Sequence, residues 1–415
     1  MTLFRHKRSV GSEEAEQINC ARSNSLFKEY EVGPGIFKLA EGPFISYQRT
    51  VDIDMQTSDF EVTETFSYKI SAPFWHYLLH FPMKRALKNS NSSKNFNIWW
   101  APPNRFDALT SRTVSLLCVA AIVTGFLGAL IGQTATFAAE EFGAGDRAQG
   151  ILLATVRIGV LLTVFITALA DNRGRKKLLE FSLYGGCCLA VLSAVAPNLW
   201  ALGITQSFAR GFATSISILI GIMAAEAAPK GSRAYIAGLL TLSAGLGAGI
   251  PVWILFLADL HLKGWRLLFA TALIFFPVIR WIHLHLEESK RFINHIENHK
   301  FNNGRKQKVI VKRVLFLASV AFLLFLFVSP ASQFRNEFLR DERDFSAAKI
   351  SLFLLTAYTP QIIGVAIASK VSDLKGRKPV AMIAVGIGTI LTVGSYSIAG
   401  FGMWLITMFA GIISA

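Results

Sequence analysis

The sequence predicts an all-α integral membrane protein made of tandem six-helix bundles, with the second bundle incomplete, and a small α+β extension at the N-terminus. Of the 415 residues, 52% are hydrophobic and only 17% are charged, whereas soluble domains are about 25% charged. From about residue 113 onward, apolar blocks follow one another, and each has the roughly 20 residues that cross a bilayer core. A charged motif also occurs twice, about 200 residues apart, which indicates two related halves.

Residues 1–109 are expected to form a cytoplasmic extension. Apolar and polar residues alternate over 60–70, as in a half-buried strand, and 47–55 suggests a preceding strand joined through a turn at 56–59. A helix over about 74–85 is too short to span a bilayer and is expected in the membrane interface, followed by a polar linker. Two strands and one helix bury little apolar surface, so the extension should pack on the membrane domain or on lipid headgroups.

Residues 110–300 should form a complete bundle of six helices, and residues 301–415 a partial bundle of four. The expected spans are 113–133, 150–170, 178–196, 199–224, 234–257, 266–286, 313–331, 346–369, 379–398 and 401–415. Seventeen Lys and Arg residues lie in the connections on the N-terminal side, against five on the other side. Because positive residues collect in cytoplasmic loops, the N-terminus is expected in the cytoplasm, and the plasma membrane is the expected location.

The repeated motif has the form Asp-x-x-Gly-Arg-Lys and joins the second and third helix of each half. The first copy comprises Asp171, Gly174, Arg175 and Lys176, and the second comprises Asp373, Gly376, Arg377 and Lys378. Glycine permits a sharp turn that a Cβ atom would block, and an aspartate is well placed beside the positive N-terminus of a neighbouring helix.

These two copies, at corresponding helix junctions, resemble the loop motif of the major facilitator superfamily over about residues 110–415. The usual leading glycine is replaced by Thr167 and Ser369, which are also small. The resemblance implies a secondary transporter that works by alternating access, with both loops holding one conformation of the cycle. The alternative is that the loops only anchor the topology.

Two further segments are similar to the sugar and metabolite porter branch of that superfamily. They are EAAPKGSR at 226–233 and EESKRF at 287–292, where Glu287 replaces the proline of the branch signature. The resemblance implies a cytoplasmic charge cluster that includes Glu226, Arg233, Glu288 and Arg291. Solvated interfacial charges are the alternative. The glycines of GLGAGIP, at 245–251, favour close helix packing.

Two arginines lie at membrane depth, where charged residues are functional candidates. Counted from the outer ends of their helices, Arg157 and Arg210 are roughly 12 and 16 Å deep. No Asp or Glu lies in the middle of a predicted span, so the arginines suggest an anionic substrate. The alternative is a hydrogen bond to a carbonyl or a pair with a carboxylate from elsewhere. Tyr358 and Gln361 are further candidates for a substrate site.

Several functions are disfavoured. The net charge of +15 resides in short loops without a nucleic-acid motif, so the expected partners are a small-molecule substrate and the lipid bilayer. The sequence has no metal cluster, nucleophile elbow or phosphate loop, so neither enzyme activity nor a cofactor or metal is expected. Ten spans, where the family has twelve, leave open a degenerate transporter or a membrane receptor or scaffold. Drug-type efflux is a further alternative.

Overall fold

The computed structural model describes residues 2–55, 60–89, 98, 100–288, 311–333, 335, 338–345 and 347–414. The chain forms two compact units, Met1–Phe292 and Ile293–Ala415. The first unit contains both the N-terminal extension and a helical bundle. The second contains the remaining helices and has its own apolar cluster around Phe353 and Met403.

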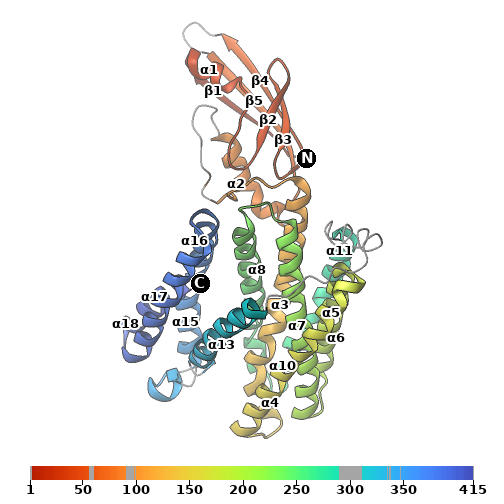
Figure 1. Ribbon diagram of the computed structural model, residues 1–415, viewed down its shortest axis with the longest axis vertical. Coiled ribbons are helices and arrows are strands. Elements are labelled where there is room, and N and C mark those ends of the chain that lie inside the picture. The colour runs from red at the N-terminus through yellow and green to blue at the C-terminus, as the bar shows by residue number, and fades with distance from the viewer. Residues whose placement is uncertain are drawn as a thin grey trace. The chain divides into compact units, whose positions relative to one another are not determined.

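The extension is one antiparallel sheet with two helices (Figure 1). The strands are β1 (Thr2–Val10), β2 (Lys28–Gly33), β3 (Ile36–Glu41), β4 (Phe44–Met55) and β5 (Phe60–Ile70), and the helices are α1 (Ser12–Ile18) and α2 (His76–Lys88). Their order in the sheet is β1-β5-β4-β3-β2. The expected hairpin is present as β4 and β5, with Met55 paired to Phe60, whereas the turn at 56–59 lies outside the described residues.

The sequence predicted two strands here, and the structure corrects this number to five among the described residues. Strand β1 was missed because its inward face is mixed. Phe4 and Val10 alternate with His6 and Arg8 on that face, while the residues between them are exposed. A hydrophobic pattern alone therefore does not reveal the strand.

A charged network fills part of the interior of the extension. The buried Arg49 donates to Glu29 Oε2 at 2.7 Å, to Glu64 Oε1 at 3.2 Å and to the carbonyl of Ile18 at 2.7 Å. Arg22, also buried, bonds Glu64 and donates to the carbonyl of Leu87. Buried charges persist where ion pairs and hydrogen bonds compensate their desolvation. With the aromatic cluster around Phe27, Phe44, Phe66 and Tyr68, the extension has a core of its own.

The extension also packs against the helical bundle of its unit, as expected. The Trp75 indole donates to the carbonyl of Ser115 at 3.1 Å, and the Tyr235 hydroxyl donates to the carbonyl of Trp100 at 2.7 Å. The backbone N–H of Asn104 donates to Ser232 Oγ at 3.0 Å. These bonds attach the end of the extension to two different membrane helices.

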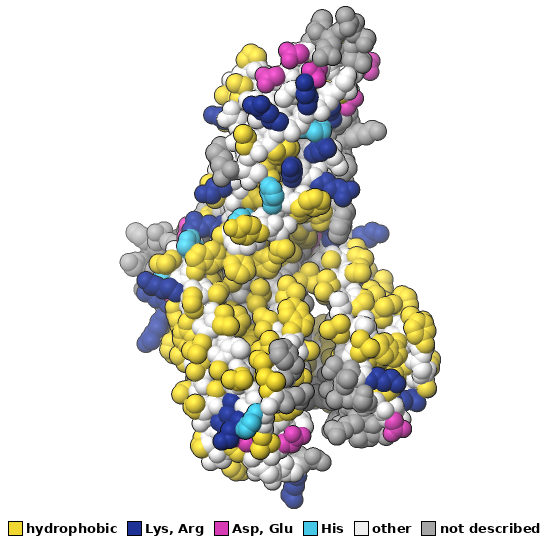
Figure 2. Space-filling model, turned by 180° about the vertical axis from the view of Figure 1, so that it is seen from behind, with side chains coloured by type: hydrophobic (Ala, Val, Ile, Leu, Met, Phe, Trp, Pro, Cys, Tyr) yellow, Lys and Arg dark blue, Asp and Glu magenta, His cyan; other side chains and the backbone are white. Residues whose placement is uncertain are grey.

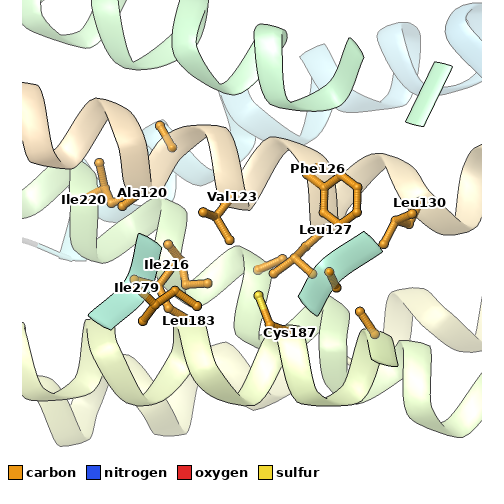
Figure 3. Packing of buried hydrophobic residues seen from close by; sticks show 14 of the residues in the cluster. Ala120, Val123, Phe126, Leu127, Leu130, Leu183, Cys187, Ile216, Ile220 and Ile279 are labelled. Carbon is orange, nitrogen blue, oxygen red and sulfur yellow. The ribbon is translucent and has the colours of Figure 1, made fainter. Parts of the chain in front are cut away.

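The first bundle is built around one long helix, α3. Its elements are α3 (Ala108–Glu141), α4 (Asp146–Ile158), α5 (Leu161–Arg173), α6 (Arg175–Ala194), α7 (Leu199–Ala227), α8 (Arg233–Trp253), α9 (Phe256–Asp259), α10 (Trp265–Ala270), η1 (Thr271–Ile274) and α11 (Phe275–His285). Figure 3 shows side chains of α3, including Val123 and Leu127, packed toward Leu183 of α6 and Ile216 of α7. The predicted second span is present as one apolar stretch, Arg147–Ala170, in which α4 and α5 are joined by a short change of hydrogen bonding at Gly159 and Val160.

Helices α3 and α8 approach each other at glycines. A Cβ atom on Gly247 would lie 1.9 Å from the carbonyl oxygen of Ile122, and one on Gly125 would lie 1.9 Å from that of Ala244. Real atoms cannot approach so closely, so each position needs glycine. This agrees with the packing interpretation of GLGAGIP, although Gly245 has no atom within 4 Å of an added Cβ.

The second unit consists of α13 (Val311–Gln333), η2 (Phe338–Glu342), α15 (Ala347–Tyr358), α16 (Gln361–Lys375), α17 (Arg377–Ser397) and α18 (Phe401–Ser414). In the described residues of the whole chain, eight helices are long and apolar enough to cross a membrane, and two shorter apolar helices lie at Val314–Val328 and Phe401–Ser414. Figure 2 shows many hydrophobic side chains on the visible face of the helical part. Such a surface is stable in lipid rather than in water.

Candidate functional site

The two copies of the repeated motif form the same backbone turn. Gly174, between α5 and α6, has φ 102° and ψ 138°, and Gly376, between α16 and α17, has φ 95° and ψ 153°. Each glycine N–H closes the preceding helix, by bonding the carbonyl of Ala170 or Ser372 at 3.1 Å. Only glycine adopts these angles without strain. The turn expected from the sequence is therefore present in both halves.

The first copy brings together charges from three parts of the first unit. Arg175, the first residue of α6, forms an ion pair with Glu226 near the end of α7, and both side chains are at least four-fifths buried. The backbone N–H of Lys176 donates to both carboxylate oxygens of Glu288, at 3.1 and 3.2 Å. Glu288 thus neutralises the positive N-terminal end of α6.

Other members expected in this charge cluster are placed differently. Arg233, at the start of α8, is exposed and takes part in no ion pair with a described residue. Arg291 lies outside the described residues, and so does the side chain of Asp171. The structure therefore brings together Arg175, Glu226 and Glu288, with Lys176 contributing its backbone.

Sequence reasoning missed a third carboxylate at this site. Glu180, on α6, lies 2.7 Å from His283 Nδ1 of α11 and 3.8 Å from Lys176 Nζ. The spacing from Lys176 to Glu180 is i, i+4 on one helix, which is a recognisable pairing signal. Together with Glu288, this contact ties α6 to α11 and to the segment that follows α11.

The second copy has different surroundings. Arg377 and Lys378, at the start of α17, are both exposed, and neither takes part in an ion pair among the described residues. Asp373 is half-buried near the end of α16. The repeated turn is thus shared, whereas Arg377 and Lys378 of the second copy are exposed, unlike the largely buried Arg175 of the first.

The two membrane arginines lie near each other in the first bundle. Arg210, about the middle of α7, is half-buried and donates to the carbonyl of Gly128 on α3 at 3.0 Å. Arg157 is exposed at the end of α4, just before Gly159. The two residues lie on α4 and α7, which pack against each other. Two cationic side chains therefore lie on neighbouring helices of the first bundle.

Tyr358 and Gln361 flank a break in the second unit, where α15 ends and α16 begins, and both are half-buried. The structure adds Arg335, which is only 4% exposed. Its guanidinium donates to Thr407 Oγ1 at 3.3 Å and lies 4.2 Å from the ring centroid of Tyr396, and its charge also reaches Tyr358. Arg335 lies just beyond the predicted span 313–331 and was not among the candidates expected from the sequence.

A further ion pair lies at the other end of the first bundle and was also missed. Arg266 of α10 donates to both carboxylate oxygens of Glu141, at 2.8 and 2.9 Å, and to the carbonyl of Ala194 at 2.9 Å. The Trp265 indole donates to the same carboxylate at 2.7 Å. Such a bidentate pair is stronger than an ordinary surface ion pair, and it fixes the end of α3 to α10 and α6.

Comparison with solved structures shows the fold. The proton:xylose symporter XylE bound to 6-bromo-6-deoxy-D-glucose matches with a TM-score of 0.58 and 16% identity, over 74% of this chain and 80% of that chain. XylE from E. coli in a partially occluded inward-open conformation gives 0.55 and 18%, over 74% and 82%. FucP in the outward conformation gives 0.54 and 14%, over 72% and 81%.

No curated protein matches the chain significantly. A family model does match, and it covers residues 117–415, which include every membrane helix except the first turns of α3. The model is that of the Major Facilitator Superfamily. Together with the shared fold and the repeated loop, this match shows that the chain is a multi-pass membrane transporter belonging to the Major Facilitator Superfamily.

Proposed function

We propose that this transporter is a secondary carrier of a small organic anion and works by alternating access. The observation that carries the proposal is the pair Arg157 and Arg210. Arg210 bonds a neutral carbonyl, so that bond does not cancel its positive charge, and Arg157 lies on α4, which packs against the helix of Arg210. Positive charge in a weakly solvated site favours an anionic ligand.

A sugar is the second candidate. Two of the similar structures are of a xylose transporter, and the half-buried Tyr358 and Gln361 offer a hydroxyl and an amide suited to an uncharged polyol. Identities of 16 and 18% do not carry a substrate from one protein to another. The positive pair in the first bundle therefore favours the anion.

The first loop is proposed to stabilise one conformation of the cycle. The ion pair of Arg175 with Glu226 and the capping of α6 by Glu288 tie together helix ends that are far apart in the sequence. Breaking these contacts would release the ends of α6 and α7. The second loop, with Asp373, Gly376, Arg377 and Lys378, is proposed to shape the matching turn between α16 and α17.

Transport in proteoliposomes tests the substrate. Uptake of lactate, citrate and benzoate is compared with uptake of xylose and glucose, with and without a pH gradient. Arg210→Gln should reduce anion uptake at least tenfold, Arg210→Lys should retain part of it, and Arg147→Gln, on an exposed residue in the first turn of α4, is the control. Uptake of sugars alone, unaffected by Arg210→Gln, would contradict the anion proposal. If folded protein moves none of the solutes, the carrier proposal fails.

The proposed orientation places the N-terminal extension in the cytoplasm, at the plasma membrane. Cys20 is exposed on that extension, whereas Cys118 and Cys187 are buried in the bundle. In a Cys188→Ser background, a membrane-impermeant maleimide should label Cys20 in inverted vesicles and not in intact cells. Labelling in intact cells would contradict the orientation. Cys20→Ser provides the blank.

A further inference from the structure

Helix α2 of the extension has an exposed aromatic face. Tyr77, Leu78 and Phe81 are 82, 70 and 73% exposed. The opposite face of α2 is occupied, because Met83 and Leu87 are buried in the core of the extension. A helix with one face packed on its own domain and a second apolar face left open has a partner still to bind.

Contacts with the bundle place the start of α2 at membrane level. Just before α2, the Trp75 indole donates to the carbonyl of Ser115, and Ser115 Oγ donates to the carbonyl of Pro73 at 2.7 Å. Ser115 lies three residues beyond Arg112 on α3, or about 4.5 Å deeper along the helix. Arg112 lies 3.9 Å from Glu287, and this pair of charges marks the boundary of the apolar part of the bundle.

A strained residue holds this junction. Phe74 has φ 71°, a conformation that is unfavourable for a bulky side chain and persists where the surroundings impose it. Its ring centroid lies 6.3 Å from that of Trp281 on α11. Aromatic rings gather at membrane–water interfaces. Phe74 and Trp281 thus join α2 to a second membrane helix at the same end of the bundle.

From these contacts we infer that the face of α2 formed by Tyr77, Leu78 and Phe81 lies in the lipid leaflet at this end of the first bundle. The three side chains occupy the boundary between acyl chains and headgroups, as in interfacial amphipathic helices. Arg85, exposed one turn beyond Phe81, reaches the lipid phosphates. The leaflet is the occupant because α3 and α11, which anchor this end, belong to a bundle whose apolar helices are long enough to cross a bilayer.

The inference is tested on the full-length protein in phosphatidylcholine nanodiscs by nitroxide accessibility. The exposed Cys20 and Cys188 are replaced by serine, and Phe81→Cys carries the label, with Leu78→Cys as a second site on the same face. Ile53→Cys is the control. Ile53 is 38% exposed and pairs with Val62, roughly 26 Å along β5 from Ile70.

Oxygen concentrates in lipid, and a neutral nickel chelate concentrates in water. Labels at 81 and 78 should collide with oxygen several-fold more often than with the chelate, and the label at 53 should show the reverse. Equal exposure to the chelate at 81 and 53 would overturn the inference. Protection from both reagents at 81 would also overturn it, because a protein surface would then cover α2.

Discussion

The two copies of the loop motif share a backbone and differ in their surroundings. Gly174 and Gly376 have φ values of 102° and 95°, so both halves make the same turn. Arg175 is 16% exposed and paired with Glu226, whereas Arg377 is exposed and in no ion pair with a described residue. The repeated sequence thus forms the same turn twice, but its arginine forms an ion pair only where the rest of the chain supplies a carboxylate, as Glu226 does for Arg175.

This difference has a physical basis. A turn is local, because the dihedral angles of one glycine determine it. An ion pair requires a second residue at the right place, and the residues that meet the first loop are Glu226 and Glu288, which are 51 and 113 positions away from Arg175 in the sequence. We therefore expect backbone changes to affect both loops alike and charge changes to affect the first loop more.

The largest effect is expected from the glycines of the two turns. Gly174→Ala and Gly376→Ala should each destabilise the protein by about 1–3 kcal/mol, because alanine is strained at these angles. Thermal unfolding in detergent measures the loss. Gly386→Ala, inside α17 with no atom within 4 Å of an added Cβ, is the control. Unequal costs at the two turns would show that the backbone is not truly repeated.

The next effect separates the two copies. Arg175→Gln leaves the largely buried Glu226 without its cation, which should cost about 1–3 kcal/mol. Arg377→Gln, on an exposed side chain, should change the free energy of unfolding by less than about 0.5 kcal/mol. Chemical denaturation of both variants checks this contrast. Equal losses would mean that the second arginine also has a partner that matters.

A smaller effect is expected at the capping carboxylate. Glu288→Gln removes a negative charge from the N-terminal end of α6 and should cost about 0.3–1 kcal/mol at low salt, with less lost at high salt. Glu287→Gln is the matched neighbour, since Glu287 is 62% exposed and its ion-pair distance is 3.9 Å. The same loss in both variants would argue against a specific cap.

The smallest effect is a pH dependence confined to the extension. Burial, followed by the charges of Lys88 and Arg8, holds the pKa of His6 below its ordinary 6.5, and Glu64 opposes this. Below about pH 6.5, the unfolded chain takes up a proton that the folded chain resists, so stability falls as the pH falls.

His6→Asn should flatten this profile between pH 7.5 and 5.5 without changing stability at pH 7.5 by a comparable amount. Unfolding followed across that range provides the measurement. A variant that keeps the full slope would assign the pH dependence to other groups. The loop cluster can then be studied near neutral pH without interference from the extension.

The fold class could be predicted from the sequence because membrane helices follow from the length of apolar runs. The repeated turn was predictable as well, since Gly174 and Gly376 recur within the same motif. Strand β1 was not, because His6 and Arg8 face inward and interrupt the apolar alternation. The inward-facing Arg8 pairs at 3.0 Å with Glu64, which lies on the neighbouring strand β5 but is distant in the sequence.

The candidate site was predicted in part. Arg175, Glu226 and Glu288 come together at the start of α6. They could be predicted because the family resemblance carries information about residues that are distant in the sequence. Glu180 and Arg335 were missed because burial depends on which helices pack together. Arg335 follows a predicted span by four residues, and only its contacts with Tyr396 and Thr407 show that it is buried.

A double-mutant cycle on Arg175 and Glu226 tests the central claim, that an ion pair between these two side chains holds the first loop. The free energies of unfolding of Arg175→Gln, Glu226→Gln and the double variant are compared with that of the unmodified protein. A favourable coupling energy of about 0.5–3 kcal/mol is predicted, as for residues in direct contact. A coupling energy near zero would contradict the claim, because the two side chains would then contribute independently.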